Sequence, residues 1–293
     1  MNKRLLAFVI LLLTVCVAPA QNKDSLAFVN GPWKTRIIHW GGIKLRQCAF
    51  TDSSLFRSNQ FVSILEVRNS FRFDIVADSI LVLTEDFVAY SGALAGINGS
   101  FFAWDAPWNS VDYLRVDNRD LAPNQIKENR RLFHQTAAIA VSNKGKLSVY
   151  RVPDSDMETA PGEDWERSIV AEDVLTSGPL LRFKGENMPL LSSSFYTTRH
   201  PRTALGIRRG GRVLMVVVDG RAARAAGMSL EELQQILKWI RAYDAVNLDG
   251  GGSSTLCVRK NATLPVQTVN HPSDNKQFDA LGARRVANAI VVK

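Results

Sequence analysis

Asn247-Leu248-Asp249-Gly250-Gly251-Gly252-Ser253-Ser254-Thr255 is the segment around which this sequence is organised. Short apolar stretches flank it, Ala245 to Leu248 before and Thr255 to Val258 after, which predicts a strand, a tight polar turn and a second strand. Phosphate is the ligand class that gains most from clustered, unshielded backbone donors such as those of the three glycines. Asp249 adds a carboxylate. The pattern predicts a turn that admits a ligand, although a plain glycine-rich hairpin would look the same.

A second Asp-Gly pair lies upstream in a matching setting. The apolar run Gly211 to Val218 predicts a buried strand that ends at Asp219-Gly220-Arg221. Ser229 and Glu232 match a capping box, and apolar residues at helical spacing predict an amphipathic helix over 229–242. If the two strands joined by this helix are parallel, both Asp-Gly turns leave the same edge of the sheet, where open α/β sheets bind ligands.

The rest of the chain is rich in strand patterns. The sequence therefore predicts an α+β fold with mixed β-sheets and a few helices, including one strand–helix–strand crossover that carries the Asp-Gly turns. Further strands are predicted over 35–39, 42–49, 61–67, 71–76 and 80–83, and a second helix over 85–94. The polar stretches 103–133 and 151–167 show little periodicity and predict irregular surface excursions.

Seven segments follow one another in the order that one known family shows. They are GINGSFF (96–102), SGPLL (177–181), RTALG (202–206), VDGR (218–221), GMSLEEL (227–233), NLDGGGSS (247–254) and VNHP (269–272). Over roughly residues 90–293 the chain resembles the phosphodiester glycosidase family, with Ser100 where that family often has glycine. The resemblance implies hydrolysis of the bond between a sugar anomeric carbon and a phosphate oxygen, and it implies the same α+β architecture.

The resemblance and the twin turns together indicate three catalytic residues. Asp219 and Asp249 are the candidate carboxylate pair, because glycoside hydrolysis generally uses two carboxylates, and the sequence leaves open which one is nucleophile or base. A phosphate group departs as a stable anion, so a cation can replace the general acid. Arg202 is the candidate because a guanidinium binds phosphate bidentately. We expect Arg202 and both aspartates to line one cleft.

The candidate substrate-binding residues are polar residues or glycines inside the matched segments. Asparagine both donates and accepts hydrogen bonds, which suits sugar hydroxyls or an acetamido group, although each could equally be a turn residue. The set is Asn98, Arg221, Asn247, Gly250, Gly251, Gly252, Ser253, Ser254 and Asn270. His200 and His271, each before a proline, are expected to be exposed turn histidines.

Two other classes of protein remain open at this stage. A non-catalytic carbohydrate-binding protein could use Trp104 and Trp108, in the polar stretch, to stack on sugar rings. A metal-assisted phosphodiesterase would cleave the P–O bond with aspartate and asparagine as hard oxygen ligands. No loop shows calcium spacing and no His/Cys cluster shows zinc spacing. We therefore expect no cofactor and assign no metal ligand; a divalent metal is chemically compatible but unsupported.

The N-terminus predicts export. A basic start, an apolar run from Leu5 to Val17 and the small residues Ala18-Pro19-Ala20 match a signal peptide over 1–20. Residues 21–90 then form an N-terminal β-rich region, and residues 91–293 the phosphodiester glycosidase-like domain. We expect a secreted or periplasmic protein; a lipid anchor at Cys16 is less favoured because Val15 is bulky. No later stretch reaches membrane-spanning length.

The charge and cysteine content narrow the partners. The formal net charge is +8 and falls to +6 when Lys3 and Arg4 leave with the signal peptide. This excess would attract an anionic sugar-phosphodiester, derived from a glycan or the cell envelope. Nucleic-acid binding is not expected, since there is no basic helix and no nucleic-acid motif. Cys48 and Cys257 are expected to be buried free thiols.

Overall fold

The computed structural model describes residues 22–107, 109–158 and 165–293, so the predicted signal peptide and Trp108 lie outside the described residues. The strands are β1 (Lys34–His39), β2 (Ile43–Leu55), β3 (Ser58–Val67), β4 (Phe73–Leu83), β5 (Ala95–Asn98), β6 (Leu114–Val116), β7 (Arg119–Ala122), β8 (Ile126–Lys127), β9 (Arg130–Arg131), β10 (Ala137–Val141), β11 (Leu147–Arg151), β12 (Asp173–Ser177), β13 (Leu180–Phe183), β14 (Glu186–Asn187), β15 (Arg202–Ile207), β16 (Val213–Val218), β17 (Asp244–Asn247), β18 (Leu256–Val258), β19 (Gln267–Thr268) and β20 (Arg285–Val292).

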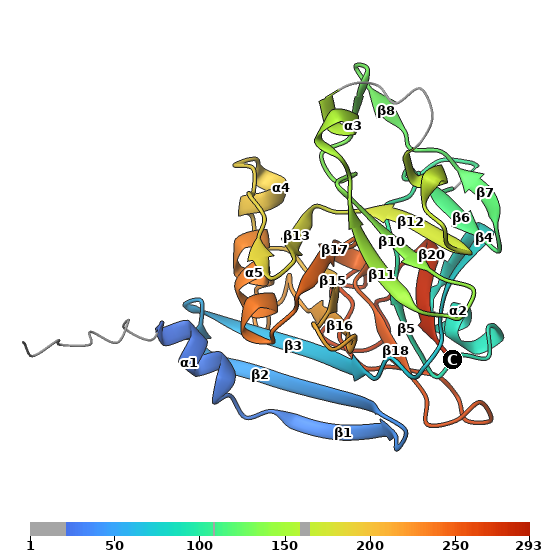
Figure 1. Cartoon of the computed structure of the whole chain (residues 1–293). Helices are drawn as coiled ribbons and strands as arrows, with labels where there is room; N and C mark the ends of the chain where they lie inside the picture. Colours follow the sequence, from blue (N-terminus) through green and yellow to red (C-terminus); the bar gives the residue numbers. More distant parts are fainter. Residues whose placement is uncertain (1–21, 108, 159–164) are drawn as a thin grey trace, which may run out of the picture.

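The helices are short and the described residues are mostly in strands, which is consistent with the predicted α+β fold (Figure 1). They are α1 (Lys23–Val29), α2 (Thr84–Tyr90), α3 (Asp154–Glu158), α4 (Ser194–Thr197) and α5 (Leu230–Trp239), with 3₁₀ turns at Trp165–Ser168 and Gly251–Ser253. The capping box is confirmed: the Ser229 side chain accepts from the Glu232 N–H, and the Glu232 side chain accepts from the Ser229 N–H. The predicted second helix is confirmed by α2.

Three larger sheets build the body. One has eight strands in the order β1-β2-β3-β16-β15-β17-β13-β14, and the other two have five strands each, β11-β10-β12-β6-β7 and β19-β18-β5-β20-β4. The N-terminal region is β-rich, and it shares sheets with the rest, because β3 pairs with β16 and β4 pairs with β20. The division at residues 90 and 91 stays a prediction, with strands from both sides of it in the same sheets.

The register of β15 determines where the Asp-Gly turns emerge. β15 is antiparallel to both of its neighbours, with Arg202 opposite Val218 of β16 and Ala204 opposite Asn247 of β17. The strands β16 and β17 therefore run in the same direction with β15 between them. Their carboxyl ends meet the start of β15 at one edge of the sheet, and α5 lies between them along the chain.

The glycine segment does not form a hairpin. It leaves β17 in the eight-stranded sheet and enters β18, which pairs with β5 and β19 in a different sheet. The two flanking strands are thus present near the predicted positions, but the turn connects two layers. Pairing between β18 and β5 brings Asn98 and Gly99, at the end of β5, beside this connection.

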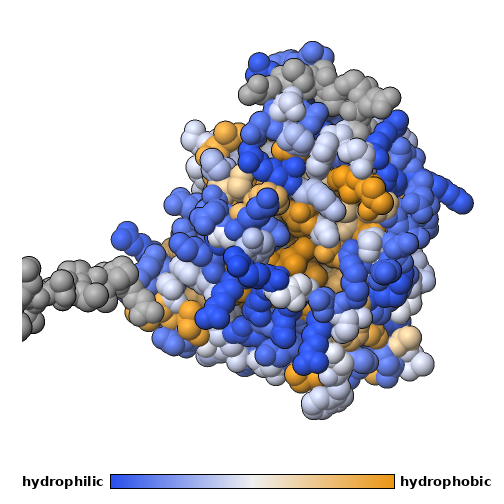
Figure 2. Space-filling view, viewed as in Figure 1, coloured by the Kyte–Doolittle hydropathy of each residue, from blue (hydrophilic) through white to orange (hydrophobic). Residues whose placement is uncertain are grey.

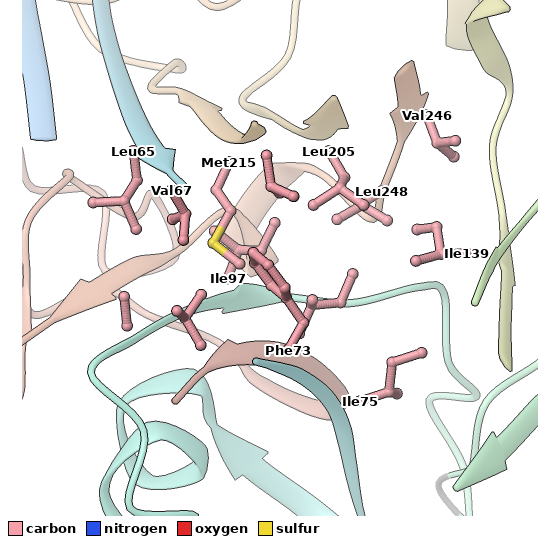
Figure 3. Close-up of a cluster of buried hydrophobic side chains, with 14 of the residues drawn as sticks. Leu65, Val67, Phe73, Ile75, Ile97, Ile139, Leu205, Met215, Val246 and Leu248 are labelled. Atoms are coloured by element: carbon pink, nitrogen blue, oxygen red, sulfur yellow. The ribbon is translucent and has the colours of Figure 1, made fainter. Parts of the chain in front are cut away.

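A continuous apolar core fixes that sheet edge. Side chains from the eight-stranded sheet, such as Leu65, Leu205 and Met215, pack near Phe73 and Ile97, which belong to the five-stranded sheet that contains β4 and β5 (Figure 3). A second cluster packs α5 against the opposite face of the eight-stranded sheet. Each such fully buried side chain contributes about 1.5–3 kcal/mol relative to an exposed one, so the scaffold of the site is rigid.

Other expectations had mixed outcomes. The prediction of an irregular stretch over 103–133 is partly wrong, because four short strands within it pair to form the hairpins β6–β7 and β8–β9. Cys48 and Cys257 are buried and unpaired, as expected. In the part of the chain described, no helix has the length and apolar character needed to cross a membrane. The face seen in Figure 2 is mostly hydrophilic, with a hydrophobic patch near its centre.

Candidate active site

A cleft of about 220 Å³ lies where β15, β16 and β17 bring their ends together. Its lining residues are Phe195, His200, Pro201, Arg202, Arg221, Asp249, Gly250, Gly251 and Arg284. The lining therefore includes three arginines and one aspartate. The expectation of a shared cleft holds for Arg202 and Asp249; Asp219 is not among the lining residues.

Asp249 presents its carboxylate to this cleft from a backbone that is tied on both sides. Its N–H donates to Gly99 O (3.1 Å), and its carbonyl accepts from Asn98 Nδ2 (2.8 Å). Burial raises the pKa of Asp249 to about 6. Ser253, Arg284, the Gly250 N–H and His134 each act to lower this pKa, but burial is the larger effect. A carboxyl whose pKa lies close to neutral is suited to proton transfer or nucleophilic attack.

Arg202 forms a buried wall of the cleft and is only 2% exposed. Its Nε donates to Met228 O (2.9 Å), and its Nη2 donates to Phe195 O and Thr198 O (2.8 and 2.9 Å). The guanidinium also lies 5.2 Å from the centre of the Phe195 ring. Burial lowers the pKa of Arg202 to about 10, so the group stays charged at neutral pH.

The other two arginines reach the cleft from different loops. Arg221 has φ of +60°, and its Nη2 would lie 3.0 Å from a Cβ added at Gly251. Arg284 is held by Asp274, with Nε–Oδ2 at 2.7 Å and Nη2–Oδ1 at 2.8 Å. With Arg202, these arginines bring three positive charges to the cleft, against the negative charges of Asp249 and Asp274. The cleft therefore favours an anion.

The glycine loop uses much of its own backbone. The Gly250 N–H donates to Asp249 Oδ1 (2.8 Å), and the Gly251 N–H donates to Pro201 O (2.9 Å). A Cβ at Gly250 would lie 2.7 Å from Pro201 O, and one at Gly252 would overlap Asp274. The glycines are therefore required by close packing, and protein acceptors already use these two N–H groups.

Asp219 lies behind the cleft and is 1% exposed. Its Oδ1 accepts from Asn270 Nδ2 (2.9 Å), and its Oδ2 is 2.7 Å from His271 Nδ1. The His271 ring stacks on Phe278 at 3.9 Å, and its side chain is 24% exposed. The expectation of an exposed turn histidine is therefore wrong for His271, because a buried carboxylate and an aromatic ring hold it; His200 is also half-buried, in the cleft wall.

The three predicted asparagines are buried and hold the loop together. Asn98 Oδ1 accepts from Thr203 Oγ1 and from the Thr255 N–H, while Asn270 Nδ2 also donates to Ser254 O. Asn247 Nδ2 donates to Gly178 O and Leu248 O. Their amides are thus occupied by protein groups, and direct sugar contacts by them stay predictions.

Ser253 and Ser254 are also buried. Neither hydroxyl has a partner with hydrogen-bond geometry among the described residues, although Ser253 is near enough to lower the pKa of Asp249. Both hydroxyls are buried and neither serine lines the cleft, so their contact with a substrate stays a prediction.

Several residues of the site carry no sequence signal that we recognised. Arg284 directly precedes β20, and Phe195 lies in α4, a helix too short to predict. His134 and Asp112 lie 2.8 Å apart (Nε2 to Oδ1), with Ser100 bonded to the same carboxylate. Of these three residues, only Ser100 lies in one of the seven segments that carry the family resemblance. In residues 22–107, 109–158 and 165–293, no group of three or more His, Cys, Asp or Glu side chains is placed to hold a metal ion.

Comparison with known proteins agrees with this geometry. The phosphodiester glycosidase family model matches residues 91–293, so the chain belongs to the phosphodiester glycosidase family, a family of hydrolases. The mouse N-acetylglucosamine-1-phosphodiester alpha-N-acetylglucosaminidase is 35% identical over 99 residues, which are 34% of this chain and 18% of that protein. An uncharacterized SPbeta prophage-derived protein of Bacillus subtilis, YomE, is 27% identical over 106 residues, or 31% of this chain and 16% of the relative. The chain thus matches less than a fifth of the length of these relatives.

A solved structure supports the fold. The catalytic domain of zebrafish N-acetylglucosamine-1-phosphodiester alpha-N-acetylglucosaminidase, auto-inhibited by its pro-peptide, superposes with a TM-score of 0.60 at 19% identity. The match covers 90% of this chain and 84% of that one. It therefore includes strands on both sides of residue 90.

Proposed function

We propose that this chain is an exported glycosidase that hydrolyses the bond between a sugar anomeric carbon and a phosphodiester. The observation that carries the proposal is the cleft in which Asp249 stands among Arg202, Arg221 and Arg284. One carboxylate surrounded by cations is suited to a substrate that develops positive charge at the sugar and negative charge at the phosphate. The family of the chain has this chemistry in its name.

In this proposal the carboxylate of Asp249 acts at the anomeric carbon. With a pKa of about 6 it is mostly ionised at neutral pH, as a nucleophile or base must be. The phosphate leaves as an anion and takes the electron pair of the C–O bond with it. Arg202 and Arg221 bind its oxygens more strongly as this charge builds, and only such differential binding accelerates the reaction. No cofactor is invoked.

Asp219 is the second carboxylate of the proposal, and it acts at one remove. It binds Asn270, which holds Ser254 O, so it supports the glycine loop that carries Asp249. It also fixes the His271 ring through Nδ1. Asp219 directly follows β16 and Asp249 lies two residues beyond β17, and the positions of these strand ends support keeping the two as a functional pair.

The binding candidates keep their proposed roles around this centre. Gly251 leaves room for the phosphate beside Arg221, Gly250 and Gly252 let the loop pack closely, and Ser253 and Ser254 meet the substrate through their hydroxyls in this proposal. Asn98, Asn247 and Asn270 are buried and contribute to substrate binding through the loop that they order. The substrate is a sugar-phosphodiester from a glycan or the cell envelope, met outside the cytoplasm after signal-peptide cleavage; nucleic acid is not a partner in this proposal.

Hydrolysis in water labelled with ¹⁸O tests the proposal. The purified protein is offered a panel of sugar 1-phosphodiesters, and released sugar and phosphate are analysed by mass spectrometry. Label in the sugar is the expected result, because it means that the C–O bond breaks. Label in the phosphate would make the chain a phosphodiesterase, and binding without release of sugar would make it a carbohydrate-binding protein.

A further inference from the structure

A buried polar network lies beside the cleft and is used by none of the roles above. Asp112 accepts at Oδ2 from Ser100 Oγ and at Oδ1 from Gln135 Nε2 (3.0 Å). Its Oδ1 also lies 2.8 Å from His134 Nε2. Because a carboxylate only accepts, His134 Nε2 carries a proton here, and in the neutral imidazole the lone pair of the ring is on Nδ1.

That lone pair has no partner. His134 is 6% exposed, and its Nδ1 is buried without a hydrogen-bond partner in the described part of the chain. Leaving a buried acceptor unpaired is energetically unfavourable, so native structures rarely keep one unless water or a ligand completes it. In its neutral form, His134 thus presents an acceptor atom, Nδ1, for which the described part of the chain supplies no hydrogen-bond donor.

The acceptor lies on the Asp249 side of the cleft. Gly99 accepts the backbone N–H of Asp249, and the next residue, Ser100, belongs to the network. The His134 ring packs at 4.2 Å on Phe101, whose ring is 6.1 Å from that of Phe195 in the cleft wall.

We propose that His134 Nδ1 accepts a hydrogen bond from a hydroxyl group held against Asp249, and that Asp112 is the positioning residue that fixes the ring for this contact. The hydroxyl is one of the sugar or that of the attacking water. The inference rests on the proposed function for the nature of the ligand. It adds a specificity determinant, since a site with a buried acceptor discriminates strongly against an analogue that lacks the matching hydroxyl.

Binding and turnover are measured on the wild type and four variants. Three of them are His134→Phe, which removes the acceptor, His134→Gln, which restores an oxygen acceptor, and Asp112→Ala, which removes the carboxylate that keeps the proton on Nε2 and fixes the ring. The matched control is His39→Phe, an exposed histidine at the end of β1 that does not line the cleft. The binding probes are glucose 1-phosphate and its monodeoxy analogues, measured by calorimetry, and thermal unfolding verifies that each variant is folded.

If the donor is a sugar hydroxyl, one deoxy analogue binds wild type at least ~10-fold more weakly than the parent, and His134→Phe no longer distinguishes the two. If the donor is the water, binding is unchanged in His134→Phe while kcat falls at least ~10-fold at constant KM. In either case Asp112→Ala behaves like His134→Phe, and His134→Gln recovers part of the loss.

Unchanged binding discrimination together with unchanged kcat in His134→Phe would overturn the proposal. If His134→Phe does not fold, the same comparison between Asp112→Ala and His134→Gln decides, and equal behaviour of those two would overturn it. Hydroxyl-dependent binding by a wild-type protein that releases no sugar from any phosphodiester would leave this inference standing and refute the proposed reaction. A wild-type protein with neither property would refute both.

Discussion

Replacement of Asp249 by asparagine separates stability from activity in this protein. Burial raises the pKa of Asp249 from 3.8 to about 6 in the folded state. The unfolded chain ionises near pH ~4, so between pH 4 and 6 the folded state binds more protons and stability falls as the pH rises. Two pKa units correspond to about 3 kcal/mol, which is an upper bound because the side chain faces the cleft.

Asparagine removes this charge and keeps an oxygen for the Gly250 N–H. We therefore expect Asp249→Asn to be more stable than wild type by about 1–3 kcal/mol at pH 7.5 and nearly equal to it near pH 4. Urea unfolding at the two pH values measures both free energies. An unchanged difference in stability between wild type and variant across this range would refute the reasoning.

The same substitution lowers kcat/KM by at least ~10²-fold, and wild-type kcat/KM rises with pH through about 6 as the carboxylate ionises. The control is Asp173→Asn. Asp173 also has a pKa raised to about 6, but it binds the backbone N–H groups of Ile75 and Asp117 and does not line the cleft. We expect its kcat/KM to be unchanged. Near-wild-type activity of Asp249→Asn would remove Asp249 from the chemistry.

Three further substitutions address the anion site and the second carboxylate. Arg202→Ala, verified as folded by thermal unfolding, is expected to lower kcat for the phosphodiester beyond any change in KM, and to harm a substrate with a neutral aryl leaving group much less; equal losses would assign Arg202 to sugar positioning or the fold. Gly251→Val is expected to lower phosphodiester turnover at least ~10-fold, because φ there is +62° and the new Cβ meets Arg221, whereas Gly210→Val, in open space, should not. Asp219→Asn is expected to lower kcat/KM at least ~10²-fold in a folded protein, and wild-type rates in steady-state kinetics would remove Asp219 from the pair.

Local patterns were sufficient where a single element was involved. The capping box at Ser229 and the apolar spacing after it predicted α5, because capping and amphipathicity depend on residues within a few positions of one another. The β-branched run before Asp219 predicted β16, because a short continuous apolar run is itself a local pattern typical of a buried strand. The hairpins over 103–133 were missed because short, polar strands there are stabilised by their partners rather than by an apolar period.

The sequence by itself determined the strands and the helix that lead into the two Asp-Gly turns, and it placed Arg202 and Asp249 among the candidates. Only the tertiary structure decided what their side chains face. β15 between β16 and β17 brought Arg202 to Asp249, and the pairing of β18 with β5 brought the network of Ser100 and its partners beside them. Asp219 lies in an Asp-Gly pair like that of Asp249, but its side chain is buried and hydrogen-bonded to His271. Contacts between residues more than a hundred positions apart depend on sheet pairing, which no local pattern of residues encodes.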